Sequence, residues 1–72
     1  MNKHDIQALI QAGLPTARVT VLGDDGQHFE AEVVCADFAG KTPVAQHRMV
    51  YATLGEKMGR EIHALKLTTR AA

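Results

Sequence analysis

The sequence contains no serine, only one cysteine, and no continuous apolar run that could serve as a signal-peptide core or a membrane span. A chain without serine cannot perform serine-based catalysis, and a lone cysteine can build neither a disulfide framework nor a cysteine-rich zinc site. Net charge is also missing, because eight Lys and Arg residues balance eight Asp and Glu residues. No overall field therefore attracts phosphate backbones or anionic lipid. These absences favour a cytoplasmic protein that does not associate with membranes.

The composition is that of a globular protein, with 46% hydrophobic and 22% charged residues over 72 positions. A domain of this size buries only about 60% of the surface that its unfolded chain exposes, so the core is small. We expect a single domain over residues 1–72, in which residues 69–72 lack any pattern and form a frayed tail.

Apolar spacing predicts a short first helix, which Asn2 or Asp5 caps and the Gly-Leu-Pro sequence at 13–15 ends. Its apolar positions are Ile6, Leu9, Ile10 and Leu14. Two strands follow, at 18–22, where β-branched residues are enriched, and at 28–35, where apolar and polar residues alternate. The Gly-Asp-Asp-Gly sequence between them tolerates positive φ and predicts a hairpin turn, so the two strands should be antiparallel.

A longer helix is predicted to begin with Thr42 as N-cap and Pro43 as first residue, and to end near Gly59, with Gly55 loosening its last turn. Apolar side chains recur along it every three or four residues and should face the sheet. These positions are Val44, His47, Tyr51, Leu54 and Met58. A third strand is predicted at 62–68. The order αββαβ predicts an α+β two-layer sandwich, in which both helices cover one face of a three-stranded sheet and the other face stays accessible.

No pair of side chains indicates an enzyme active site. Cys35 is in phase with the core-facing residues of its strand, and a cysteine in apolar surroundings is inert. Glu30 and Glu32 share one face of that strand, as in any solvated strand, and no apolar pocket is indicated that would raise the pKa of either carboxyl. Asp24 and Asp25 are explained by turn formation. We therefore expect a protein that is not an enzyme.

Three histidines lie beside or within apolar patterns. His47 lies within the helical stripe and is expected to pack there, and His28 opens the second strand. His63 is in phase with Leu65 and Leu67, which places it at the rim of the apolar face. This placement alone favours a structural role at the edge of the core, although a neutral imidazole there could also ligate a metal. The sequence has no His-x-x-His or Cys-x-x-Cys pair, so the chain cannot complete a metal site alone.

Four segments, in their order and spacing, resemble the BolA-like family. They lie at 26–29 (GQHF), 33–41 (VVCADFAGK), 46–51 (QHRMVY) and 62–65 (IHAL). The resemblance extends over about residues 4–69, and its most specific motifs are in the last two segments. It implies a fold similar to the class II KH domain, in agreement with the αββαβ order, but without the GxxG clamp of KH domains.

The resemblance also implies a partner and a cofactor. Members of the family pair with monothiol glutaredoxins, and the two proteins share a [2Fe-2S] cluster with glutathione, in iron–sulfur trafficking or in iron and redox regulation. The histidine of the Ile-His-Ala-Leu motif is a cluster ligand in this family and corresponds to His63. A second ligand often comes from the loop between the first two strands. That loop is short and acidic here, which leaves His28 as the candidate, whereas Cys35 matches a position often occupied by serine. No cofactor is expected in the isolated chain, which should be a monomer or a weak homodimer.

Some bacterial members of the family are described as DNA-binding transcriptional regulators of morphology and stress responses. The basic residues that could form a nucleic-acid interface around the long helix are Lys41, Arg48, Lys57 and Arg60. Scattered basic residues are also typical of a solvated face. Nucleic-acid-binding regulation is therefore the alternative function.

Overall fold

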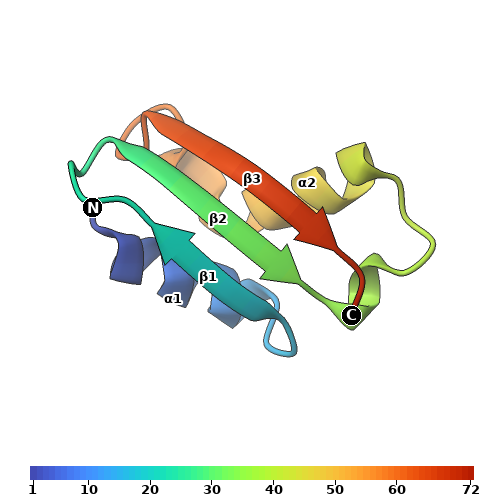
Figure 1. Ribbon diagram of the computed structural model, residues 1–72. Coiled ribbons are helices and arrows are strands. Elements are labelled where there is room, and N and C mark those ends of the chain that lie inside the picture. Colours follow the sequence, from blue (N-terminus) through green and yellow to red (C-terminus); the bar gives the residue numbers. More distant parts are fainter.

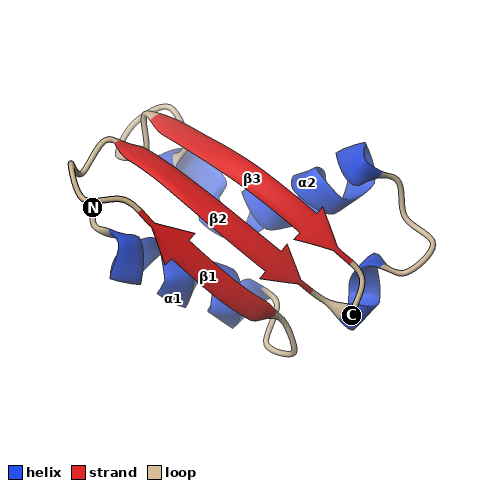
Figure 2. Cartoon of the chain, in the orientation of Figure 1, coloured by secondary structure: helices blue, strands red, loops and turns tan.

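Two helices lie against one face of a three-stranded sheet in the computed structural model, which describes residues 1–72 (Figures 1 and 2). The elements are α1 (Lys3–Gly13), β1 (Arg18–Leu22), β2 (His28–Val34), the 3₁₀ turn η1 (Ala36–Phe38), α2 (Pro43–Leu54), the 3₁₀ turn η2 (Gly55–Lys57) and β3 (Ala64–Arg70). The predicted αββαβ order and the two-layer α+β architecture are confirmed. Neither helix is at once long and apolar enough to span a bilayer.

Side-chain caps explain where the two helices begin. The Asn2 side chain accepts a hydrogen bond from the Asp5 N–H (3.0 Å), and the Asp5 carboxylate accepts one from the Asn2 N–H (3.1 Å). This capping box satisfies two of the N–H groups that a helix start leaves unpaired. Thr42 accepts a hydrogen bond from the Ala45 N–H (3.2 Å), with Pro43 as the first residue of α2. Both predicted helix starts are confirmed.

The sheet has the order β1-β2-β3, with β1 antiparallel and β3 parallel to the central strand β2. The tight 23–27 connection produces the antiparallel pair, whereas α2 is the crossover that allows β3 to run parallel. Phe29, Ala31 and Val33 face the helices and are buried. Glu30 and Glu32 alternate with them and lie on the open face, which is exposed as expected.

The helix α2 is rotated relative to the prediction. Its buried residues are Gln46, Val50 and Leu54, whereas Val44 is 60% and Tyr51 is 37% exposed. The predicted stripe is correct at Leu54 and at Met58, which packs against the core, but wrong at Val44 and Tyr51, because hydropathy assigned a polar residue to the surface. The Gln46 amide donates to the carbonyls of Lys41 (2.9 Å) and Phe38 (3.3 Å), and its oxygen accepts from the Thr69 hydroxyl (2.7 Å). A polar side chain with all these partners can be buried at little cost.

The end of α2 and the bounds of β3 also differ from the prediction. Gly55 adopts φ +58° and ends the helix at Leu54, so Gly59 is not its C-cap. β3 begins at Ala64, two residues later than predicted, because Ile62 instead forms a bridge with Met58. At its other end β3 includes residues 69–70, which the sequence left to a frayed tail. The N–H of Cys35 donates to the Arg70 carbonyl (3.1 Å), which ties this end of the strand to the sheet.

Gly23 allows the hairpin turn to pass close to the second strand. It adopts φ +152°, and a Cβ at this position would lie 2.6 Å from the His28 carbonyl oxygen and 2.7 Å from Cδ1 of Phe29. We expect Gly23→Ala to lower the free energy of unfolding by about 2–3 kcal/mol, from backbone strain and overpacking together. Gly26 also has positive φ (+75°), but nothing lies within 4 Å of its added Cβ. Gly26→Ala should therefore cost only about 1 kcal/mol. Equal losses for the two variants in urea denaturation would contradict this account.

Candidate functional site

One end of the sheet brings together two histidines that are far apart in the sequence. Because β2 and β3 are parallel, both strands begin at the same end of the sheet (Figure 1). His28 is the first residue of β2, and its partner in the register is Ala64, which directly follows His63. The Ala64 N–H donates to the Gln27 carbonyl (3.2 Å) and fixes this alignment. His28 and His63 are therefore near neighbours at the start of adjacent strands.

The backbone on both sides of His63 is fixed, whereas its side chain has no partner within the chain. Ile62 is fully buried in the core and Ala64 is hydrogen-bonded into the sheet, so the backbone on both sides of His63 is fixed. The His63 side chain is exposed, and unlike His28 it has no hydrogen-bond or salt-bridge partner within the chain. The strand alternation, which favoured a packed histidine at the core edge, therefore gave the wrong environment for this residue. Its imidazole is therefore available to bind an external group.

His28 is oriented by Asp25 from the preceding turn. Its Nδ1 lies 2.8 Å from Oδ2 of Asp25, and its side chain is 70% exposed. A carboxylate at Nδ1 favours the neutral tautomer that carries its proton on Nδ1. In this tautomer Nε2 is unprotonated, and its lone pair can bind a metal ion. Histidines that ligate metals are typically oriented by this kind of carboxylate contact. The turn prediction for Asp25 missed this second role, which the Asp-x-x-His spacing could have indicated.

The Asp25 carboxylate also closes the turn through the backbone. Its Oδ1 accepts hydrogen bonds from the N–H groups of His28 (2.8 Å) and Gln27 (2.9 Å). The His28 N–H, then the His28 ring, and then the Gln27 N–H hold the pKa of Asp25 well below its usual range. The Asp25 carboxylate is thus ionised at neutral pH and in mild acid.

The depressed pKa of Asp25 predicts a pH-dependent stability. A carboxyl group whose pKa is lower in the folded state stabilises the fold above its ordinary pKa of 3.8, and this contribution is lost as the pH falls below that value. Asp25→Asn should therefore lower the free energy of unfolding at neutral pH, and the difference from the wild type should shrink in acid. Asp24→Asn is the matched control, because the Asp24 side chain is 97% exposed. Denaturant unfolding at several pH values measures both, and parallel curves for the wild type and Asp25→Asn would contradict the assignment.

The chain does not bring together a complete metal site. No group of three or more His, Cys, Asp or Glu side chains is placed to hold an ion. Cys35 is fully buried and follows the opposite end of β2, so it cannot join the two histidines. His47 lies on α2 with its ring edge-to-face against Tyr51, at 6.5 Å between centroids. His28 and His63 are therefore the candidate donors that the chain places at this end of the sheet.

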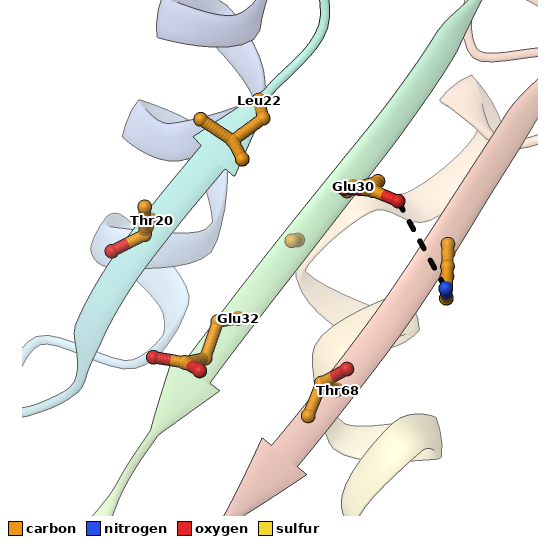
Figure 3. Close-up of a pocket in the computed structure, with 7 residues that line it drawn as sticks. Thr20, Leu22, Glu30, Glu32 and Thr68 are labelled. Carbon is orange, nitrogen blue, oxygen red and sulfur yellow. Dashed lines mark ion pairs between the residues drawn. The ribbon is translucent and has the colours of Figure 1, made fainter.

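The open face of the sheet carries a shallow hollow but no catalytic arrangement. Figure 3 shows Thr20, Leu22, Glu30, Glu32 and Thr68 around this hollow of about 290 Å³. The two carboxylates are ion-paired across the strands, Glu30 with Lys66 (4.0 Å) and Glu32 with Arg70 (3.9 Å). A second hollow of about 440 Å³ extends from Leu22 past His28 to Ala64. Open, solvated carboxylates lack the apolar surroundings that an acid catalyst needs.

The four basic residues proposed for nucleic acid lie in and around the long helix, and two of them are ion-paired. Only Arg48 lies within α2, and Lys41 precedes the helix. The other two are paired with acidic neighbours, Lys57 with Glu61 (3.6 Å) and Arg60 with Glu56 (3.8 Å). Two of the four basic residues are thus close to a compensating charge.

Comparison with known proteins gives a consistent result. The family model described as "BolA-like protein" matches residues 4–72. The chain is 39% identical over 70 residues to "Protein BOLA2" of Arabidopsis thaliana, covering 93% of this chain and 74% of that protein. It is 48% identical over 42 residues to the "DNA-binding transcriptional regulator BolA" of Vibrio cholerae, covering 58% of this chain and 40% of the relative.

Solved structures agree with the sequence comparison. A bolA protein homologue from Coxiella burnetii superposes with a TM-score of 0.84 at 47% identity, covering 96% of this chain and 88% of that one. The "BolA domain of SufE1" from Arabidopsis thaliana gives 0.79 at 25% identity, covering 96% of this chain and 90% of that one. The same fold therefore occurs both as a separate chain and as a domain of another protein.

Proposed function

Because this chain belongs to the BolA-like family, we propose that it is a non-enzymatic adaptor that binds a monothiol glutaredoxin and shares a [2Fe-2S] cluster with it. The setting is iron–sulfur trafficking, or iron and redox regulation, in the cytoplasm. The single observation that carries the proposal is the exposed, unpartnered imidazole of His63, fixed at the end of the sheet beside His28.

The two histidines would act differently in such a complex. His63 is free to turn its ring toward a docked partner, and His28 offers Nε2 while Asp25 holds its Nδ1. The partner's thiolate and glutathione would supply the other ligands. A bound [2Fe-2S] cluster gains a higher reduction potential when neutral imidazoles replace thiolates, as in Rieske centres. The histidines must be unprotonated to bind iron, so acid should favour loss of the cluster.

The proposal that the protein is not an enzyme rests on the state of its reactive side chains. Cys35, the only thiol, is fully buried, and the Glu30 and Glu32 carboxylates are paired with basic residues at the surface. No nucleophile has a neighbouring base within hydrogen-bond reach, which covalent catalysis would require.

DNA-binding regulation in transcription or stress responses is the second candidate, and the name of the Vibrio cholerae relative, a DNA-binding transcriptional regulator, favours it. In this chain the unpaired basic residues at α2 are Lys41 and Arg48. A phosphate-binding surface would give a steep loss of affinity with salt. Titration of duplex DNA at two salt concentrations decides this candidate, because absence of binding at low salt would reject it.

Mixing the protein with a cluster-loaded monothiol glutaredoxin tests the adaptor proposal. Exchange of a thiolate for an imidazole ligand changes the charge-transfer bands of the cluster, so the visible spectrum should change in proportion to the protein added. A spectrum equal to the sum of the two separate components would reject the proposal.

A further inference from the structure

The two edge strands of the sheet differ in how far their outward backbone groups are covered. Along β1, glutamine side chains of α1 cover the outward backbone. The Gln7 amide donates to the Val19 carbonyl (3.2 Å), and the Gln11 amide donates to the Ala17 carbonyl (2.8 Å). Such hydrogen bonds occupy backbone groups through which an edge strand could otherwise pair with another chain. At the β1 edge, the chain thus covers the Val19 carbonyl and the Ala17 carbonyl just before the strand.

The β3 edge has no such cover. The Ala64 N–H donates toward β2 and the Arg70 carbonyl accepts from that side, so alternate residues from 64 to 70 direct their backbone groups inward. Leu65, Leu67 and Thr69 consequently direct theirs outward, and these groups make no hydrogen bond within the chain. The side chains of Leu65 and Leu67 are only half-buried, although they face the core side. β3 lies at the free edge in Figure 1.

An apolar flank of α2 runs beside this open edge. Thr53 of α2 packs on Gly13 of α1, so the side of α2 that carries Thr53 faces α1. Tyr51 is two residues away, about 200° around the helix, and therefore lies on the opposite flank, on the side of the β3 edge. Val44 and His47 share this flank with Tyr51, and Val44 is the most exposed large apolar residue of the chain. Three residues of the stripe that the sequence predicted to face the sheet, Val44, His47 and Tyr51, thus lie along its uncovered side.

We propose that the β3 edge binds a second copy of this chain, with the two β3 strands antiparallel around a twofold axis at Leu67. Leu67 would then pair with Leu67 of the partner subunit, and Leu65 with Thr69 of the partner subunit. Leu65, Leu67 and Thr69 would then each form a hydrogen-bonded pair, in which the N–H of each residue donates to the carbonyl of the other. The product is a continuous six-stranded sheet, with the apolar flanks of the two α2 helices facing each other behind it. Such an interface is self-complementary, as a twofold dimer requires.

The charges of β3 select this register. On the open face it sets Lys66 opposite Thr68 of the partner subunit, and Arg70 opposite Ala64 of the partner subunit. A register shifted by two residues in one direction would place the two Lys66 side chains opposite each other. A shift of two residues in the other direction would place Lys66 opposite Arg70 of the partner subunit. Like charges directly opposite each other destabilise an antiparallel pair. Shifts by one residue would set outward groups against groups that already bond within the sheet. The register centred on Leu67 is the one that avoids both penalties.

The dimer is separate from the proposed cluster site. His63 precedes the paired residues of β3, so the two His63 rings would lie at opposite ends of the interface. Dimerisation therefore does not depend on the function proposed above, and His63→Ala should dimerise like the wild type.

Sedimentation velocity of the whole chain, from about 10 μM to about 1 mM at low salt, tests the dimer. The wild type should show a concentration-dependent shift from monomer to dimer. Thr68→Lys adds a like charge opposite Lys66 twice in each dimer, and should raise the dissociation constant about tenfold. Thr20→Lys is the matched control, because Thr20 and Thr68 are both exposed and both flank Glu32, on the two neighbouring strands. It should leave the dissociation constant unchanged.

Amide hydrogen exchange locates the interface directly. The N–H groups of Leu65, Leu67 and Thr69 should exchange more slowly as the wild-type concentration rises, and this protection should be lost in Thr68→Lys. A wild type that stays monomeric at the highest concentration would overturn the proposal. So would dimerisation that Thr20→Lys weakens as much as Thr68→Lys does.

Discussion

His63→Ala should abolish the spectral change that the wild-type protein causes in a cluster-loaded monothiol glutaredoxin. The loss of affinity for the shared cluster should be at least about 100-fold, because even the outer partners of metal ligands contribute about 10–100-fold. The side chain is exposed and has no partner within the chain, so its removal should not disturb the fold. Visible absorption and circular dichroism of the mixture measure the effect.

The other histidines provide the controls for this variant. His47→Ala removes an imidazole from α2, where the ring contacts Tyr51, and should leave the spectral change intact. His28→Ala should weaken cluster retention if the ring beside Asp25 is the second ligand. Equal spectra for the wild type and His63→Ala would exclude His63 as a ligand, whatever the result for His28.

Phe38→Ala should lower the free energy of unfolding by about 3–5 kcal/mol, the range for loss of a buried aromatic side chain. Phe38 is fully buried, lies in η1 and belongs to the hydrophobic core. Small domains have little stability to lose, since a total of about 5–15 kcal/mol is usual for folded proteins. The variant should therefore be partly unfolded at physiological temperature.

Leu22→Ala is the matched control for Phe38→Ala. Leu22 is also a large apolar residue, but it lies on the open face and is 55% exposed. Its truncation should cost less than about 1 kcal/mol. Thermal and urea unfolding of the two variants compare the sites, and a Phe38→Ala loss as small as that of Leu22→Ala would show that η1 does not anchor the core.

Much of the fold could be predicted because its signals are local. The hairpin follows from Gly23 and the residues after it, and the helix starts follow from Asn2 and Thr42, whose caps act within three residues. The alternation of β2 is equally local, because it follows from the strand period alone. Such signals depend on neighbours along the chain and need no knowledge of tertiary contacts.

The errors arise where distant contacts decide. Gln46 is buried because backbone carbonyls before α2 and Thr69 of β3 satisfy its amide, and no local pattern shows these partners. In the sequence, Phe38 lies just after the alternating pattern of the second strand, where no local signal indicates a core residue. It is nevertheless one of the largest side chains in the core. Both residues link η1, α2 and β3, so the packing of these elements was the part that the sequence left open.

The sequence proposed the residues of the candidate site, but it could not predict their geometry. The Ile-His-Ala-Leu motif indicated His63, whereas periodicity placed the ring at the edge of the core. Its exposure follows from the late start of β3, since Ile62 enters the core before the strand begins. The contact between Asp25 and His28 depends on the hairpin turn that brings them within 2.8 Å, and it emerged only from the structure.

Pulsed electron paramagnetic resonance of the reduced complex tests the central claim most directly. The chain is labelled with ¹⁵N and mixed with an unlabelled, cluster-loaded monothiol glutaredoxin and unlabelled glutathione. If His63 binds the cluster, a strongly coupled ¹⁵N signal should appear and should vanish when labelled His63→Ala replaces the wild type. A spectrum with no strong ¹⁵N coupling from the labelled wild-type chain would contradict the account.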